Sequence, residues 1–370
     1  ALAESLLKDS LKTSPSEAYQ DTLSPANDSL ATLAESVRFG AFASAAKGTN
    51  YEEVLENDLV RITFSSKGGT IREVLLKKHY KTVRDTNGKD TKELVKMLNS
   101  PNNRFEYRLP VKGSATGTVS TSELFFTPSK QGNTVTFRAT TTNGGYFEQK
   151  YTLAPDNYIV DYSIAAKDLG DILGQGQKSL DFYWENHLNK YEIASNYEQN
   201  QSTVYFKEKD ERRDYCSCTS DDTKEVTEKG IQWVAHANQF FSSALMAGDQ
   251  SFEQGKMTTR LVDLTKSEDV KVVTSEFKVP LSNLNSGSHD MKMYIGPNEF
   301  KRLRALGNDL EEVIPFGSSI FGTINRWFIR PFFDFLSQYI SSKGIVIILL
   351  IFLIKMLLYP LMYKMLYSQA

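Results

Sequence analysis

Lys355 is the one charged side chain in a long apolar stretch near the C-terminal end of the sequence, between Gly344 and Tyr363. A cation placed well inside a membrane-spanning helix costs about 2.5–3.5 kcal/mol on insertion scales, so it usually has a partner or water beside it. Lys355 is therefore the first candidate for a functional residue. The alternative is snorkelling: if the helix ends at Tyr359-Pro360, Lys355 lies about one turn inside that end, and its stem could reach the interface.

No catalytic or metal-binding constellation accompanies this lysine in the sequence. Cys216 and Cys218 are separated by one residue, so a disulfide between them would close almost no loop, and no second Cys/His pair stands at zinc-ligand spacing. The histidines stand in no spacing typical of a zinc hydrolase or an activated nucleophile; they are His79, His187, His236 and His289. We therefore predict a protein that is not an enzyme and that uses neither a cofactor nor a metal ion.

The apolar stretch has the length of a membrane-spanning helix. Residues Ile345 to Ile354 include no polar side chain, and about 20 mostly apolar residues let an α-helix cross a hydrocarbon core about 30 Å thick. A buried helix of a soluble domain usually keeps a polar stripe, which this window lacks. The sequence therefore predicts a spanning helix over 343–363 that tethers a large extramembrane domain to a bilayer.

Length and charge restrict the possible organisation and partners. The chain has 370 residues, which as a prior suggests two or three structural units. Its formal net charge is −2. This near-neutral balance argues against a nucleic-acid partner, because nucleic-acid binding normally requires a basic face.

Alternating apolar and polar residues dominate the chain from about 51 to 296. Val60, Ile62 and Phe64 alternate with polar neighbours, and a Lys67-Gly68-Gly69 turn follows. The same period of two recurs over 135–139, 158–164 and 291–295, bounded by Gly, Asn and Pro clusters. Without long amphipathic helices between them, such runs indicate antiparallel sheets packed face to face. The predicted fold class is mainly β.

Trp184, Glu185 and His187 stand close together within this β region. A sandwich of this kind resembles sugar-binding mutarotases, so a carbohydrate site is the main alternative from a different functional class. Such a site would need a histidine and a carboxylate converging in an aromatic cleft. Packing of Trp184 and Trp233 in the core is the purely structural interpretation.

Residues 1–50 are rich in Ala, Ser, Leu, Asp and Thr and show no sustained period. We predict a flexible linker there, with one short helix near Glu4–Leu11. An Asp-hydroxyl-Leu pattern occurs three times in it, around Ser10, Thr22 and Ser29. The pattern resembles an O-glycosylation sequon that some bacteria use on extracytoplasmic proteins, and chance in a Ser/Leu-rich linker is the alternative. An intact mass of the native protein without a hexose-scale excess would exclude glycosylation.

After residue 296 the period changes to that of helices. Short connecting helices are expected over 297–316, and an amphipathic helix over 317–342 that Pro331 bends or divides. An aromatic-faced helix immediately before a span should lie in the membrane interface, and packing against the sandwich is the alternative. The expected interfacial anchors are Trp327, Phe328, Phe332 and Phe335.

Three segments resemble the YidC membrane-protein insertases of Gram-negative bacteria. The first is an opening hairpin with Asn57-Asp58-Leu59 and Phe64 through Ile71. The second is a central motif with Trp233-Val234-Ala235 and Gln239-Phe240-Phe241-Ser242. The third is a C-terminal segment with Tyr294-Ile295-Gly296-Pro297, Asn325-Arg326-Trp327-Phe328-Ile329 and Ile345 through Leu361. The C-terminal segment is the most specific of the three. The resemblance covers about residues 51–370.

The resemblance implies a periplasmic β-supersandwich over 51–296, then an interfacial helix and the family's second transmembrane helix, in the bacterial inner membrane with 364–370 in the cytoplasm. It also implies further spanning helices outside this sequence, which would enclose a polar groove. It places Lys355 where most members carry an arginine that faces the groove and attracts acidic groups on substrate tails. Lysine keeps that charge but lacks the planar five-donor fork of arginine.

The partners that the resemblance implies are nascent inner-membrane proteins, the Sec translocon with its SecDF accessory, and the lipid bilayer. A membrane-tethered sandwich that binds carbohydrate or translocon subunits, with no insertase role, is the remaining alternative.

Overall fold

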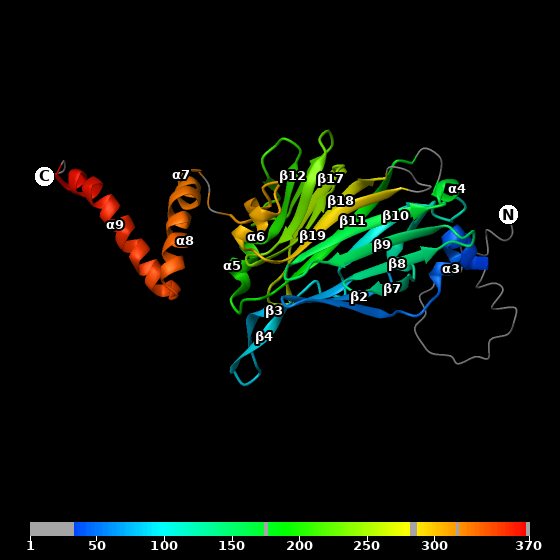
Figure 1. Ribbon diagram of the computed structural model, residues 1–370, viewed down its shortest axis with the longest axis horizontal. Coiled ribbons are helices and arrows are strands. Elements are labelled where there is room, and N and C mark those ends of the chain that lie inside the picture. The colour runs from blue at the N-terminus through cyan, green and yellow to red at the C-terminus, as the bar shows by residue number, and fades with distance from the viewer. Residues whose placement is uncertain (1–32, 174–176, 282–286, 316, 318, 368–370) are drawn as a thin grey trace.

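The computed structural model describes residues 33–173, 177–281, 287–315, 317 and 319–367. A β-sandwich occupies its middle, with short N-terminal helices at one end and the C-terminal helices at the other (Figure 1). The helix predicted near 4–11 lies outside the described residues, as do Ser10, Thr22 and Ser29.

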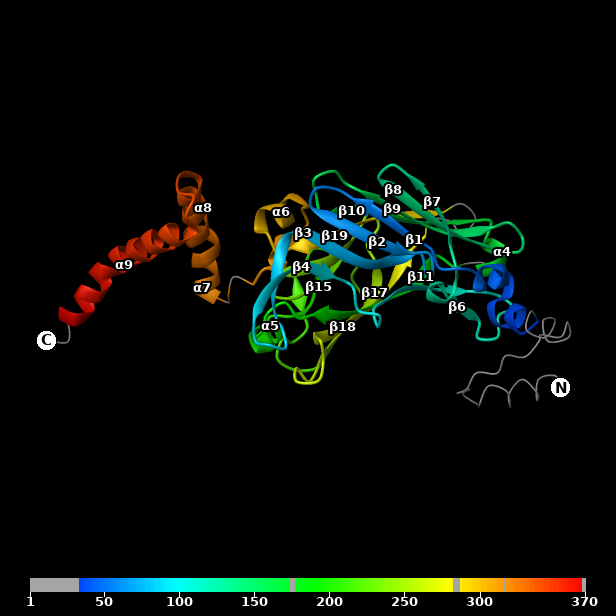
Figure 2. The same cartoon turned by 90° about the horizontal axis from the view of Figure 1, so that it is seen from below.

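Three antiparallel sheets form the sandwich. The four-stranded sheet follows chain order and lies in front of the larger sheets in Figure 2; its strands are β1 (Glu52–Glu56), β2 (Val60–Ser65), β3 (Thr70–Arg84) and β4 (Asp90–Met97). The nine-stranded sheet has the spatial order β13 (Asp214–Tyr215), β12 (Thr203–Glu208), β15 (Ile231–Ala237), β16 (Phe241–Ala247), β19 (Ser288–Pro297), β10 (Ile159–Lys167), β9 (Tyr146–Leu153), β8 (Thr134–Thr140) and β7 (Thr127–Gln131). The six-stranded sheet has the order β14 (Asp222–Val226), β17 (Glu253–Leu261), β18 (Asp269–Pro280), β11 (Ser179–Asn189), β5 (Arg104–Pro110) and β6 (Thr118–Ser120). The predicted fold class is confirmed.

The period of two in the sequence corresponds to one buried face per strand. In β2, Val60, Ile62 and Phe64 are buried, whereas Arg61 is exposed. The runs predicted over 135–139 and 158–164 fall within β8 and, from Ile159 on, within β10, and they show the same alternation. The run over 291–295 covers half of β19, and there the alternation stops at Tyr294, which is buried like Met293 and Ile295. Successive side chains of a strand point to opposite faces, so these apolar residues meet between the sheets.

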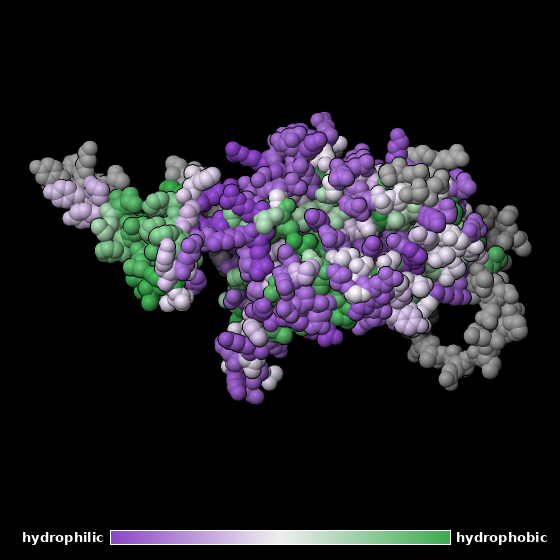
Figure 3. All heavy atoms as spheres, viewed as in Figure 1, coloured by the Kyte–Doolittle hydropathy of each residue, from purple (hydrophilic) through white to green (hydrophobic). Residues whose placement is uncertain are grey.

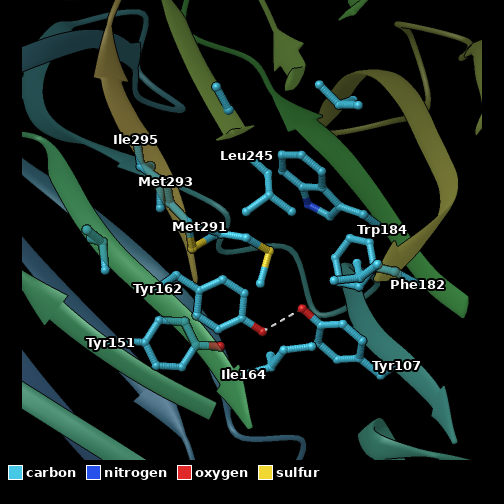
Figure 4. Close-up of a cluster of buried hydrophobic side chains, with 14 of the residues drawn as sticks. Tyr107, Tyr151, Tyr162, Ile164, Phe182, Trp184, Leu245, Met291, Met293 and Ile295 are labelled. Carbon is cyan, nitrogen blue, oxygen red and sulfur yellow. Dashed lines mark hydrogen bonds between the residues drawn. The ribbon is translucent and has the colours of Figure 1, made fainter. Parts of the chain in front are cut away.

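The two larger sheets meet in an aromatic core that contains a hydrogen-bonded centre (Figure 4). Tyr107 from β5 and Tyr162 from β10 are fully buried, and their hydroxyl groups hydrogen-bond at 3.0 Å. The Tyr162 hydroxyl also lies 2.8 Å from Oε1 of Gln149 on β9. Burial raises the pKa of both tyrosines well above the ordinary value, so both hydroxyls stay neutral.

The same centre holds the turn between β2 and β3. Gln149 donates through Nε2 to the carbonyl of Gly68 at 2.7 Å, and the Tyr151 hydroxyl donates to the carbonyl of Gly69 at 3.0 Å. Both glycines have positive φ, +82° and +61°, which a residue with a Cβ rarely adopts. One buried polar network therefore joins all three sheets, and the Gly-Gly turn is part of it.

Residues 33–46 differ from the predicted linker. They form a helical segment over 33–39, followed by η1 (Gly40–Phe42) and α3 (Ala43–Ala46). Phe39, Phe42 and Ala45 belong to the hydrophobic core, and the carbonyl of Ala45 accepts a hydrogen bond from Phe125 N at 2.7 Å. The three buried residues recur every third position, which places them on one helical face, so this part of the predicted linker is packed structure.

Short helices connect the strands and follow the last one. Those within the sandwich are η2 (Thr121–Glu123), α4 (Gly170–Leu173) and α5 (Ser195–Asn200). After β19 come α6 (Phe300–Ala305), η3 (Leu310–Val313), α7 (Ser319–Ile324), the π-helical segment η4 (Asn325–Ile329), α8 (Arg330–Tyr339) and α9 (Lys343–Tyr367). Pro331 is the second residue of α8 and follows the π-helical segment almost directly, so it stands where the continuous helix changes from π to α geometry.

Candidate functional site

Lys355 is the central residue of α9, twelve residues from each end. The helix passes through Pro360 and continues to Tyr367 instead of ending at Tyr359-Pro360. The part from Lys343 to Pro360 is long and apolar enough to span a membrane, by length and composition. In this longer helix Lys355 is about 18 Å from either terminus, at 1.5 Å of rise per residue.

Lys355 faces away from the neighbouring helix α8. Val346 and Leu350 are buried among the described side chains of α9, which packs on α8 near its start. Lys355 follows Val346 by nine residues, about two and a half turns, and therefore lies on the opposite side of the helix. Its side chain is exposed and makes no hydrogen bond or ion pair within the part of the chain that the structure describes.

The segment from η4 through α8 presents its aromatic side chains outward. Of the four predicted anchors, Trp327, Phe328 and Phe335 are exposed, whereas Phe332 is half-buried between the rings of Phe328 and Phe335. Hydrophobic residues gather on the side of the C-terminal helices away from the sandwich, and white and purple residues lie on the side next to it (Figure 3). The aromatic face is therefore not buried against the sandwich.

The polar side of the same segment contacts the sandwich end. Arg326 pairs with Glu312 of η3 at 3.1 Å, and Asp334 of α8 lies 3.4 Å from Lys301 of α6. The guanidinium of Arg330 lies 3.1 Å from the ring centroid of Phe300 on α6, in cation–π geometry. Charged contacts, rather than an apolar seam, thus hold the amphipathic segment to the β domain.

Trp327 gives a direct test of the interfacial placement. It is 75% exposed, whereas Trp184 and Trp233 are 2% and 0% exposed, so external quenchers reach mainly Trp327. In lipid vesicles we expect brominated lipids to quench its emission, with bromine near the headgroup more effective than bromine near the chain end, because indole rings concentrate at the interface. Trp327→Phe should remove the quenchable fraction. Emission quenched by aqueous iodide and unaffected by brominated lipid would contradict the placement.

An aromatic cleft of about 440 Å³ lies at the end of the sandwich that carries α5 and α6. We use this name for the cleft lined by His79 and Tyr80 of β3, by Tyr191, by Phe240 just before β16, and by Phe241, the first residue of β16. His79 packs edge-on against Phe241 with ring centroids 5.7 Å apart. The Gln239-Phe240-Phe241 motif lines this cleft, which motif spacing by itself did not predict.

Glu198 is a fully buried carboxylate behind the cleft wall. It accepts hydrogen bonds from the backbone N–H of Tyr191 at 3.0 Å and of Glu192 at 3.1 Å, and from Nδ2 of Asn238 at 3.2 Å. Burial raises the pKa of Glu198 to about 7, because desolvation outweighs these donors. One side chain thus ties α5 to the loops that form two sides of the cleft.

We expect Glu198 to make the stability of the sandwich depend on pH. The folded protein binds this proton more tightly than the unfolded chain, so the protonated carboxyl contributes stability below about pH 4.5 that is lost as the pH rises to about 7. Relative to Glu198→Gln, the wild type should lose on the order of 3 kcal/mol across that window. Denaturation midpoints at pH 4.5 and pH 8 measure the difference. The control Glu228→Gln, at an exposed position that does not act on Glu198, should keep the wild-type dependence; an equal pH dependence in Glu198→Gln would contradict the assignment.

Trp184 and His187 do not converge in one cleft. Trp184 is buried and stacks on His236 at 3.8 Å between ring centroids, whereas His187 lies between Glu185 at 3.2 Å and Asp269 at 3.0 Å near the sheet surface. Residues 184 and 187 of β11 are separated by an odd number of positions, so they occupy opposite faces of the sheet. The carbohydrate site considered from the sequence is therefore not assembled from these residues, and Trp184 is part of the core.

The remaining candidate residues form no metal or redox centre within the described ranges. Both cysteines are free thiols, and burial raises the pKa of Cys216 to about 12. No group of three or more His, Cys, Asp or Glu side chains among the described residues could hold a metal ion.

Comparison with known proteins identifies related sequences along most of the chain. The family model described as the YidC periplasmic domain matches residues 53–334. A protein named membrane protein insertase YidC from Parabacteroides distasonis is 30% identical over 360 residues, covering 93% of this chain and 55% of the relative. A protein of the same name from Phocaeicola vulgatus is 30% identical over 338 residues, covering 89% and 52%. The chain thus spans about half the length of these curated relatives.

Among solved structures, a galactose mutarotase related enzyme from Lactobacillus acidophilus is 10% identical, with a TM-score of 0.38, covering 66% of this chain and 97% of the enzyme. A likeness at that level supports no argument about sugar chemistry in this chain.

Proposed function

This chain belongs to the YidC family, and from that membership we propose that it is the sandwich and one spanning helix of an insertase that helps nascent inner-membrane proteins enter the bilayer. In this proposal the β-sandwich is periplasmic, the segment from η4 through α8 lies in the membrane interface, and α9 crosses the inner membrane toward the cytoplasm. The proposed division has the sandwich up to residue 296, short connecting helices over 297–316, the interfacial segment over 317–342 and the span over 343–363. Residues 1–32 of the predicted linker lie outside the described residues.

The observation that supports an insertase most directly is the position of Lys355. It stands in the middle of α9, on the side that α8 leaves uncovered, and has no partner among the described residues. A cation in such a place is costly unless water or a carboxylate reaches it. We propose that it lines a polar groove and attracts acidic groups on the hydrophilic tails of substrates, which would otherwise cross the hydrocarbon core uncompensated.

The Sec translocon and SecDF are proposed partners on the basis of family membership. The aromatic cleft offers a surface for such a partner, since it is open and lies on the side of the sandwich nearest the membrane helices. The same surface supports the alternative of a tethered binding module without an insertase role.

Depletion of the protein from cells tests the proposal. We expect small reporter membrane proteins with short translocated tails to lose insertion, as measured by protease protection, and to regain it when the wild type is restored. A second strain, in which residues 53–296 are deleted and the helices retained, separates the two functions. Insertion that persists in that strain places the activity in the membrane part; normal insertion after complete depletion would favour the tethered binding module.

A further inference from the structure

A pocket of about 640 Å³ lies where the sandwich meets the segment that leads into the membrane. Its walls come from the loop after β12, from η3 and from α7 with η4. We call it the arginine pocket, because three arginines line it together with one exposed tryptophan; the residues are Arg212, Arg213, Arg326 and Trp327.

The carboxylates of the arginine pocket each have a cation of their own. Glu211 pairs with Lys229, and Asp309 pairs with Lys207. The third, Glu312, pairs with Arg326. These pairs leave the pocket with two further positive charges, on Arg212 and Arg213.

Neither Arg212 nor Arg213 has a carboxylate within ion-pair distance in the part of the chain that the structure describes. Arg212 is exposed and Arg213 is half-buried. The lining contains three arginines and three carboxylates, and two positive charges remain uncompensated because two lysines that lie outside the lining pair with Asp309 and Glu211. A local excess of this kind favours an anionic ligand.

Arg213 is held in place by aromatic rings. Its guanidinium lies 5.0 Å from the ring centroids of both Tyr205 and Tyr215, which face each other across β12 and β13. Contact with ring faces orients the guanidinium plane without using its N–H donors. Those donors remain available in a fork geometry that matches the oxygens of a phosphate group.

The position of the pocket restricts the source of the phosphate. Trp327 lines the pocket and is 75% exposed, at the start of the aromatic segment that we place in the membrane interface. Tryptophan concentrates at the depth of lipid headgroups. Accepting the membrane placement of the proposed function, the pocket opens at the depth where phospholipid phosphates lie.

We propose that Arg212 and Arg213 bind the phosphate of an anionic phospholipid headgroup in the leaflet next to the sandwich, with Arg326 and Trp327 beside it. A net anionic lipid is favoured over a zwitterionic one because two cationic side chains of the pocket lack carboxylate partners. The bound headgroup would fix the end of the sandwich to the bilayer surface, close to the entry of the spanning helix.

The whole protein in detergent, titrated separately with phosphatidylglycerol and phosphatidylcholine, tests the proposal by native mass spectrometry. We expect tighter retention of phosphatidylglycerol, weakened about 30-fold in Arg212→Gln/Arg213→Gln, or about fivefold for each arginine. Lys89→Gln/Lys92→Gln removes two exposed charges from the turn and edge of the β3–β4 hairpin and should bind like the wild type. Equal binding by wild type and the arginine variant, or an equal loss in the lysine control, would overturn the site.

A competition arm separates lipid from soluble phosphate. Inorganic phosphate should fail to displace phosphatidylglycerol, since a free ion lacks the acyl chains that hold the headgroup at this depth; full displacement at millimolar phosphate would assign a soluble anion instead. Lipid retention is measured independently of insertion. Loss of selective lipid binding would therefore reject the lipid site and leave the insertase proposal unaffected. Normal reporter insertion after depletion would reject the insertase proposal and leave the lipid-binding result unaffected.

Discussion

Replacing Lys355 with leucine should lower the insertion of substrates with acidic translocated tails at least tenfold. The physical reason is the loss of a charge-assisted contact, which is worth about 1.5–3 kcal/mol and corresponds to a factor of about 10 to 150. Lys355→Arg should keep insertion near the wild-type level, because it retains the charge and adds a planar donor fork. The measurement is protease protection of reporter tails in cells depleted of the wild-type protein and expressing each variant.

Two comparisons make the result specific to the charge. Met356→Leu changes the adjacent exposed residue of α9 without altering charge and should insert like the wild type. A reporter with a neutral tail should depend less on Lys355 than one with an acidic tail. If Lys355→Leu inserts the acidic reporter as well as the wild type does, Lys355 has no role in the groove and is a snorkelling residue.

Replacing Gly69 with alanine should destabilise the sandwich by about 2–5 kcal/mol. The residue has φ of +61°, where a Cβ costs about 1–2 kcal/mol, and that Cβ would lie 2.9 Å from Nε2 of Gln149. Moving Gln149 would break its 2.7 Å hydrogen bond to the Gly68 carbonyl, and a buried unsatisfied group costs about 1–3 kcal/mol more. Guanidinium denaturation of the purified protein in detergent, followed by the far-ultraviolet circular dichroism of the strands, measures the loss.

Gly88→Ala is the matched control for Gly69→Ala. Gly88 also has positive φ, +78°, but a Cβ there would meet nothing within 4 Å, so only the backbone cost of about 1–2 kcal/mol applies. The difference between the two variants isolates the contact with Gln149. Equal losses would show that the close approach in the core has no energetic consequence.

Much of the fold follows from local sequence patterns. Ile345 to Ile354 predict the apolar helix because its length and composition are set within one window. The alternation around Val60, Ile62 and Phe64 predicts a half-buried strand for the same reason, since side-chain direction in a strand depends only on residue parity. Positions 184 and 187 differ by an odd number, which predicts that Trp184 and His187 lie on opposite faces of the strand. Their proximity in sequence had suggested a shared site.

The sequence by itself therefore determined the strands, the long apolar helix and the place of Lys355 within it, because each depends on neighbours within a few residues. Only the tertiary structure decided which distant residues meet. The apolar pattern around Phe39 and Phe42 is too short to predict that these residues are buried in the core. Arg213 and Arg326 line one pocket although 113 positions separate them, and Glu198 meets Asn238 across 40 positions. Such contacts depend on sheet order and register, which follow from the packing of the whole sandwich.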